Sequence, residues 1–209
     1  MPLRWLPTGP PPTAPRPGLA GAAHESRLLL DAMLDGDASA LLPLRAVYDG
    51  QAADWTAWCA DQPDYLLPLT DALDRLDPSD DGWVLEVSAG TGQATAVLSR
   101  RFARVLATDP SLAMIEELAA TAGSNVAAVV AESEHLPLPA RSVSLVVGLN
   151  AVPDLAEFRR VLRPGGAVLW VSSFGEETPL YIPPAELAVE WVGPAVAATA
   201  GHGDWLMLG

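Results

Sequence analysis

The spacing of apolar positions along the chain changes near residue 80. Before that point, apolar side chains recur three and four residues apart, which is the spacing of a helix face. Asp61 followed by Pro63 predicts a helix start, since an acid caps a first turn and proline fits within one. The pattern predicts helices over residues 24–33, 38–48, 50–59 and 61–76.

From residue 83 onward, short apolar runs alternate with helical stretches, which indicates βαβ units and a parallel sheet. The last two runs are separated by a glycine turn and predict an antiparallel hairpin. We therefore predict an α/β fold: a doubly wound, mostly parallel, seven-stranded Rossmann-like sheet with an N-terminal helical lid and a C-terminal antiparallel hairpin. The predicted strands are 83–87, 104–108, 125–131, 143–149, 167–173, 195–200 and 204–208, and the helices between them are 93–102, 111–122, 154–162 and 185–191.

The first 22 residues carry seven prolines and lack any such periodicity. Proline lacks a backbone N–H, so this segment is expected to be a disordered or extended tail. A proline-rich docking ligand is an alternative role for it. The predicted organisation is a Pro-rich tail over 1–22, a helical lid over 23–80 and a ligand-binding domain over 81–209.

Charge and composition narrow the function. The net charge is −14, and all twelve basic residues are arginines. An acidic chain is a poor partner for nucleic-acid phosphates, and the lack of lysine excludes a pyridoxal Schiff base or a Walker-A lysine. No apolar run reaches the ~18 residues of a membrane span, and the single cysteine gives no internal disulfide. A cytoplasmic protein without a membrane or nucleic-acid partner is expected.

The candidate ligand site is the glycine-rich turn after the first strand of the sheet. Gly90 and Gly92 let the backbone approach a ligand closely, and the following helix directs its first N–H groups at it. Asp109 ends the next strand, where its carboxylate can accept hydrogen bonds from a ribose diol. The nicotinamide-cofactor fingerprint is the main competitor. Thr95 stands at its third glycine position and Glu86 is foreign to it, so both residues argue against that reading.

Four blocks in order carry a family resemblance that covers roughly residues 83–173. Residues 84–92 resemble motif I of the class I S-adenosylmethionine (SAM) dependent methyltransferases, and 107–111, 131–139 and 158–169 resemble the blocks that follow it. The last block is typical of the small-molecule, type 11-like branch of that family. Tyr48 and Asp49, with Ala52 and Trp55 after them, are similar to an element that precedes many such domains.

The resemblance implies a role for each matching position. In the motif I turn, Glu86 and Gly90, with Ser88, Ala89 and Gly92, would lie along the methionine part of SAM, and Asp109 would hold the ribose hydroxyls. The other expected cofactor-binding residues are Pro110, Met114, Glu132, Ser133 and Leu136 around adenine, Asn150 facing the sulfonium, and Tyr48 closing over the methionine end.

Three positions depart from the family pattern. Ser88 stands where Gly or Asp is commoner, and Glu132 replaces the more usual Asp. Ser144 and Leu145 stand where Phe-Asp is typical, which puts a structural contact in doubt rather than the cofactor site.

The expected activity is transfer of a methyl group from SAM to a small-molecule or peptide acceptor, leaving S-adenosylhomocysteine (SAH). Because the sulfonium already activates the methyl group, a general base is needed only if the acceptor must lose a proton. No catalytic residue, metal ligand or oligomeric state is assigned. One alternative is a protein with the SAM fold but without methyl transfer, such as a cyclase or a non-catalytic binding or regulatory subunit. A nicotinamide-dependent oxidoreductase is the other.

Several residues have two readings. His135 is a candidate general base, but we expect it to be an exposed loop residue. His24 and His202 are expected at the surface. The group of Trp55, Trp58 and Tyr65 is either ordinary core or the aromatic wall of a substrate pocket. Cys59 is expected to be a small buried apolar group.

Overall fold

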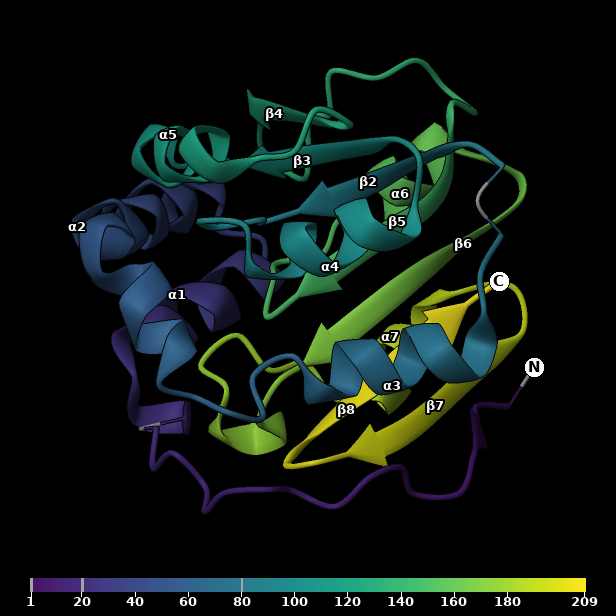
Figure 1. Ribbon diagram of the computed structural model, residues 1–209, viewed down its shortest axis with the longest axis horizontal. Coiled ribbons are helices and arrows are strands. Elements are labelled where there is room, and N and C mark those ends of the chain that lie inside the picture. The colour runs from purple at the N-terminus through teal and green to yellow at the C-terminus, as the bar shows by residue number, and fades with distance from the viewer. Residues whose placement is uncertain (1, 20, 80) are drawn as a thin grey trace.

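The computed structural model describes residues 2–19, 21–79 and 81–209, and its centre is one mixed eight-stranded sheet (Figure 1). The strands are β1 (Arg4–Trp5), β2 (Trp83–Val87), β3 (Val105–Asp109), β4 (Val126–Val130), β5 (Val143–Leu149), β6 (Leu162–Ser172), β7 (Ala195–Ala200) and β8 (Gly203–Leu208). They lie in the order β1-β7-β8-β6-β5-β2-β3-β4, and β8 runs antiparallel to both β6 and β7. The predicted α/β class, parallel sheet and closing hairpin are confirmed.

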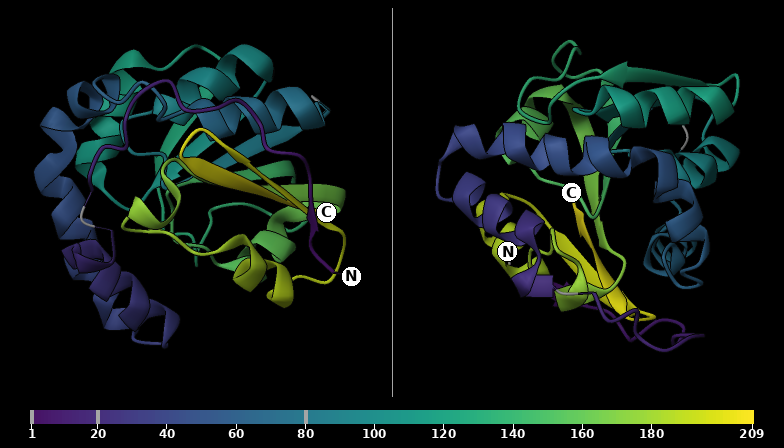
Figure 2. Two further views of the ribbon diagram at one scale, coloured as in Figure 1. Left: turned by 90° about the horizontal axis from the view of Figure 1, so that it is seen from below. Right: turned by 90° about the vertical axis from the view of Figure 1, so that its left-hand side faces the viewer.

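Seven α-helices occur in the described ranges, on both faces of the sheet and at one of its edges. They are α1 (Glu25–Leu34), α2 (Leu41–Ala60), α3 (Leu67–Leu76), α4 (Gln93–Arg101), α5 (Leu112–Thr121), α6 (Leu155–Val161) and α7 (Pro184–Glu190). Apolar residues of α3, α4 and α5 pack on one face of the sheet, and those of α6 and α7 on the other. Helices α1 and α2 lie across the carboxyl ends of the parallel strands, as the views from below and from the side show (Figure 2).

The described part of the Pro-rich segment, residues 2–19, is extended along the far edge of the sheet. Leu6 and Gly9 donate backbone N–H groups to carbonyls of β7, at 2.8 and 2.7 Å. Further on, Thr13 donates both its backbone N–H and its hydroxyl to the buried carboxylate of Asp64. The prediction of seven strands is therefore one strand short. An edge strand tolerates the neighbouring prolines because only one side of it must donate.

The N-terminal helices also differ from their predicted bounds. Residues 38–48 and 50–59 were expected as two helices, but α2 is one continuous helix of 20 residues through Gly50. Asp61 caps the end of α2 rather than the start of α3, its N–H donating to the carbonyl of Ala57. No helix within the described ranges is long and apolar enough to cross a membrane.

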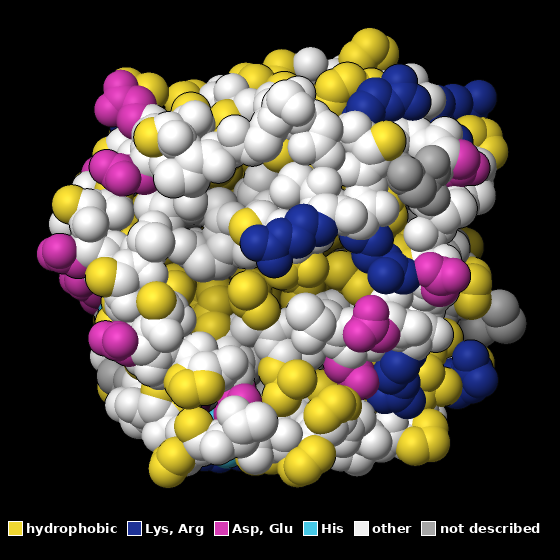
Figure 3. All heavy atoms as spheres, viewed as in Figure 1, with side chains coloured by type: hydrophobic (Ala, Val, Ile, Leu, Met, Phe, Trp, Pro, Cys, Tyr) yellow, Lys and Arg dark blue, Asp and Glu magenta, His cyan; other side chains and the backbone are white. Residues whose placement is uncertain are grey.

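Charge is unevenly distributed on the surface. On the face seen in Figure 3, arginine side chains gather on the right-hand half, and the left-hand edge, over α2 and α5, carries acidic ones. That edge is where the carboxyl ends of β2, β3 and β4 meet α1 and α2 (Figure 1).

Candidate functional site

A cavity of about 410 Å³ lies at the carboxyl ends of the strands, beneath α1 and α2. The chain passes from β2 to β3 and β4 on one side and to β5 and β6 on the other, so the cavity sits where the strand order reverses. Open α/β sheets bind their ligands at this position. Every predicted cofactor residue except Gly92 and Leu136 contributes to its lining: Tyr48, Glu86, Ser88, Ala89, Gly90, Asp109, Pro110, Met114, Glu132, Ser133 and Asn150.

The turn after β2 is a tight left-handed structure. Ser88, Gly90 and Gly92 have φ angles of +52°, +55° and +96°. A Cβ at Gly90 would project toward the indole of Trp55, 3.5 Å from its Nε1, whereas a Cβ at Gly92 would lie 3.0 Å from the Leu118 side chain. Gly90 therefore keeps the cavity wall open, and Gly92 makes room for α5 and does not line the cavity.

Asp109 lines the cavity at the end of β3. Its Oδ2 accepts from the Gly90 N–H at 2.9 Å, and its Oδ1 accepts from the Ser111 N–H at 2.8 Å. Burial raises its pKa to about 6, and the two backbone N–H groups oppose that shift. Ser111, not Asp109, caps α5, because its hydroxyl accepts from the Met114 N–H. The two N–H groups fix the carboxylate plane, and each oxygen keeps acceptor capacity for a ligand.

Glu86 is a second acid in this wall, and it is almost completely buried. Its Oε2 accepts from the Thr95 hydroxyl at 2.6 Å, and burial raises its pKa to about 8. In the sequence, Thr95 argued only against the nicotinamide-cofactor fingerprint, whose third glycine it replaces. The contact with Glu86 gives its physical role. Replacing the third glycine with threonine supplies a donor to a buried carboxyl group.

Helix α2 covers the turn and is joined to it by polar contacts. The hydroxyls of Thr56 and Thr91 lie 2.7 Å apart, and the Gln93 amide donates to Thr91 at 2.7 Å. Tyr48, from the middle of the same helix, packs edge-on against Trp55 with ring centroids 5.7 Å apart. Helix α2 is thus held directly over the glycine turn.

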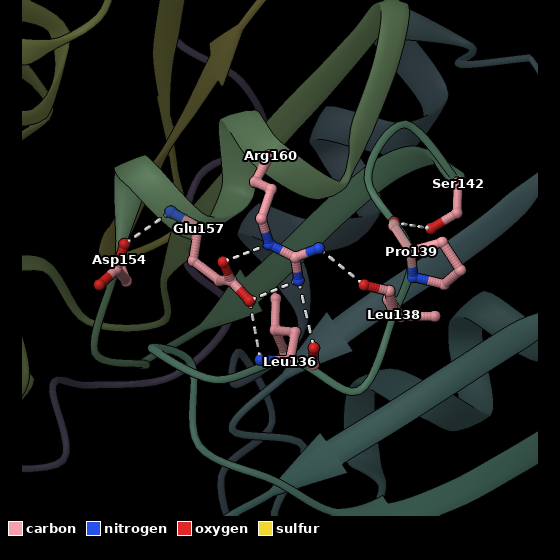
Figure 4. A network of polar contacts seen from close by, with 7 residues as sticks. All are labelled: Leu136, Leu138, Pro139, Ser142, Asp154, Glu157 and Arg160. Carbon is pink, nitrogen blue, oxygen red and sulfur yellow. Dashed lines mark hydrogen bonds and ion pairs between the residues drawn. The ribbon is translucent and has the colours of Figure 1, made fainter.

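The loop after β4 carries Glu132 and Ser133 into the cavity lining, and α6 holds it from behind. Glu157 accepts from the backbone N–H of Leu136 at 2.9 Å, and Arg160 donates to the carbonyls of Leu136 and Leu138 (Figure 4). Leu136 is buried among core side chains and does not line the cavity. A role in covering adenine therefore finds no support in its position.

Asn150 follows β5 with a φ of +52°. Its amide nitrogen donates to the Ser173 hydroxyl, and its amide oxygen accepts from the Ser173 N–H, both at 2.9 Å. The pair joins the ends of β5 and β6, so Asn150 is held at the cavity rather than free in a loop.

The histidines and the cysteine occupy different environments. His24 is not a surface residue of the first helix: it caps α1, its Nδ1 accepts from the Ser26 N–H at 3.1 Å, and it lines the cavity. The His135 side chain is 81% exposed beside Glu132. His202 contacts the backbone of the N-terminal segment. Cys59 is buried, and burial raises its pKa to about 12, so it remains a thiol at neutral pH.

Several cavity residues were not predicted from the sequence, and Arg45 is the basic one among them. Arg45 is half-buried in α2 and is the cavity's single arginine among the described lining residues. Its spacing of three from Tyr48 places both side chains on one helix face, which was the available signal.

The residues that line the cavity fit SAM. Two buried carboxyl groups suit an ammonium group and a ribose diol, Gly90 leaves the backbone open between them, and Pro110 and Met114 give an apolar surface beside Glu132 for a purine. No group of three or more His, Cys, Asp or Glu side chains in the described ranges is arranged to hold a metal ion.

Comparisons with known proteins agree with this geometry. The family described as "Methyltransferase domain" matches residues 84–166. The chain is 32% identical over 121 residues to a malonyl-[acyl-carrier protein] O-methyltransferase of Xylella fastidiosa, covering 53% of this chain and 41% of that protein. It is 31% identical to the uncharacterized methyltransferase YodH of Bacillus subtilis, covering 54% and 52%. The chain thus spans about half the length, or less, of these curated relatives.

Among solved structures, the DhpI–SAH complex superposes with a TM-score of 0.65 at 24% identity, covering 78% of this chain and 93% of that one. That likeness establishes the fold. Residues 84–166 are similar to a methyltransferase domain, and the strand-end carboxylates of the cavity agree with the SAM site of such a domain.

Proposed function

We propose that the protein binds SAM in the cavity and transfers its methyl group to a small-molecule or peptide acceptor. The observation that carries the proposal is the buried Asp109 carboxylate, oriented by two backbone N–H groups beside an open glycine turn. A structural acid would not need to face a cavity. The 23–80 segment would then act as the lid and residues 81–209 as the SAM-binding domain.

The chain's own residues would act by binding and orientation. Asp109 would accept hydrogen bonds from the ribose hydroxyls, and Glu132 would accept from the adenine amino group. Glu86 would face the ammonium group of the methionine part. Tyr48 and Trp55 would exclude water from the methionine end, since a water-free site strengthens electrostatic contacts. Asn150, fixed by Ser173, would lie beside the sulfonium.

SAM supplies a methyl group activated by the positive sulfur. A lone pair of the acceptor forms the new bond to carbon while the carbon–sulfur bond breaks and its electron pair stays on sulfur. Tyr65 interacts with Asn150, and Cys59 interacts with Tyr65. Both are poor proton acceptors, because burial raises the pKa of Tyr65 well above 10 and that of Cys59 to about 12. The proton of the acceptor would therefore leave through solvent.

The test has two parts. Calorimetry with SAM and SAH would measure binding, and incubation with methyl-labelled SAM and candidate acceptors would measure transfer through SAH release. We expect micromolar binding and label in the acceptor. No binding would reject the proposal. Binding without turnover on any acceptor would favour the alternative, a SAM-fold protein without methyl transfer. The proposed setting is cytoplasmic, without a membrane or nucleic-acid partner.

A further inference from the structure

Five aromatic rings contact one another in series along the cavity. Tyr48 packs on Trp55, and Trp55 stacks on Trp58 with centroids 5.2 Å apart. Trp58 then meets Tyr65 edge-on at 6.0 Å, and Tyr65 meets Phe174 at 6.0 Å. All five also line the cavity, so this series is part of a ligand surface as well as of the core.

The two ends of this series lie on different halves of the sheet. Burial raises the pKa of Tyr48, which lies near enough to Asp109, at the end of β3, for the charge of that carboxylate to raise it further. Phe174 follows β6, and Tyr65 interacts with Asn150, at the end of β5. We call Trp58, Tyr65, Asn150 and Phe174 the aromatic end. It lies across the strand-order reversal from the carboxylates proposed to hold SAM.

The aromatic end carries little charge. The cavity residues that follow β5 and β6 are all uncharged: Leu149, Asn150, Val152, Pro153, Phe174, Thr178, Pro179 and Leu180. The charged residues that strands and their following loops contribute to the cavity lining come from the β2–β4 half of the sheet. Helix α2 adds two charged residues to the lining. Arg45 precedes Trp58 by thirteen residues, which is about 20 Å along a helix, beyond the reach of its side chain. Asp54 precedes Trp58 by four residues, but it is exposed to solvent, which screens its charge.

Polar groups at the aromatic end already have partners. The Asn150 amide is engaged by Ser173 at both its atoms. The Thr178 hydroxyl contacts that of Ser172 at 3.0 Å and accepts from the Phe174 N–H at 3.2 Å. Among the described residues of the lining, an anion placed here would find no positive group within reach, and a cation would find only the solvent-exposed Asp54. A charged ligand would therefore lose its hydration without gaining a buried counter-charge, and this is costly.

We propose that the aromatic end binds the methyl acceptor and that the acceptor is an uncharged aromatic molecule. Ring faces and edges pack favourably on Trp58, Tyr65 and Phe174 at centroid distances of 4.5–7 Å. An acceptor there would present its nucleophilic atom beside Asn150, next to the proposed position of the sulfonium. This inference rests on the proposed function for its second ligand and adds the acceptor's chemical class.

The test uses the whole protein saturated with SAH and measures binding of three small probes by calorimetry. The probes are 2-naphthol, its saturated analogue decahydro-2-naphthol, and the anion 2-naphthoate. The variants are Trp58→Leu, which removes the ring, and Trp58→Phe, which keeps one. Trp191→Leu is the matched control, since Trp191 is equally half-buried but packs under Arg159 away from the cavity.

We expect saturable 2-naphthol binding that is about tenfold tighter than that of either other probe. Trp58→Leu should weaken it about tenfold and Trp58→Phe less than threefold, while Trp191→Leu leaves it unchanged. SAH affinity, measured first in each variant, reports separately on the proposed function and on folding. No 2-naphthol binding by SAH-bound protein, equal binding of the saturated analogue, or tighter binding of 2-naphthoate overturns the inference.

Discussion

Asp109→Asn should separate SAM binding from stability. Burial raises the pKa of Asp109 from 3.8 to about 6, despite two backbone hydrogen bonds. A rise of about two pKa units means that ionising this buried carboxyl costs on the order of 3 kcal/mol at pH 7. Asparagine has the shape of the protonated form and carries no charge. Its amide nitrogen cannot accept, however, so one of the two backbone N–H groups loses its acceptor at a cost of about 1–3 kcal/mol. Because the two effects offset each other, the ligand-free variant should unfold within a few degrees of the parent at pH 7–8.

Binding, in contrast, should weaken. The variant loses the charge and one acceptor oxygen, and a hydrogen bond to a charged group contributes about 1.5–3 kcal/mol. SAH affinity should fall roughly ten- to a hundredfold. The parent should also prefer adenosine to 2′,3′-dideoxyadenosine, and Asp109→Asn should lose most of that preference.

Asp154→Asn is the matched control for this experiment. Asp154 is half-buried and caps α6, accepting from the Glu157 N–H at 2.7 Å, outside the cavity lining. It should leave SAH affinity within twofold of the parent. Calorimetry and thermal unfolding check both variants. SAH affinity of Asp109→Asn within threefold of the parent, with the fold intact, would refute the assignment of Asp109 to the ribose.

Three further results follow from buried groups. Burial raises the pKa of Glu86 from 4.5 to about 8, so between these pH values the ligand-free folded protein binds a proton more tightly than the unfolded chain does. Its melting temperature should therefore fall as the pH rises from about 5 to 8, and Glu86→Gln should flatten this dependence. Gly148→Ala should cost about 1–3 kcal/mol in denaturant unfolding, since its Cβ would overlap the buried ring of Trp170; an unchanged midpoint would contradict this. Asp64→Ala should speed amide exchange at Thr13, which loses the acceptor of two hydrogen bonds; unchanged exchange would show that the N-terminal segment is held by other contacts.

The sheet was predictable because buried parallel strands are short apolar runs, and such runs need no distant information to be recognised. β1 was not, since two residues among prolines carry no strand pattern of their own. Its existence depends on the carbonyls that the far edge of β7 leaves free, to which Leu6 and Gly9 donate. Only the folded hairpin creates that edge.

Helix α2 was misread for an energetic reason. Gly50 costs a helix about 1 kcal/mol relative to alanine, which in the sequence alone favours a break. Tyr48 and Trp55 lie on the same face of the continuous helix and both contact the cavity and one another. Burying such rings contributes more than one glycine costs, so tertiary packing determines the helix length.

The candidate site also has one half that the sequence predicts and one half that it does not. Its β2–β4 half follows from local motifs, since each acid comes at a strand end that the pattern already marks. The other half is assembled from α2, the turn before α3 and the segment after β6, which come together only in the folded chain. No sequence motif indicates that Phe174 or His24 lines the cavity.

The predictable half of the site is also where the fold buries two carboxyl groups, those of Glu86 and Asp109. A protein selected for stability alone would not bury two carboxyl groups whose ionisation its own fold opposes, and both pKa values rise chiefly because of burial. Perturbed groups facing one cavity are characteristic of ligand sites. A cationic ligand that donates hydrogen bonds would stabilise the ionised form of both acids, and SAM carries positive charge beside a ribose diol. The burial that opposes ionisation of the two carboxyl groups therefore favours a ligand of this kind, because such a ligand would supply the charge and the hydrogen bonds that the fold does not.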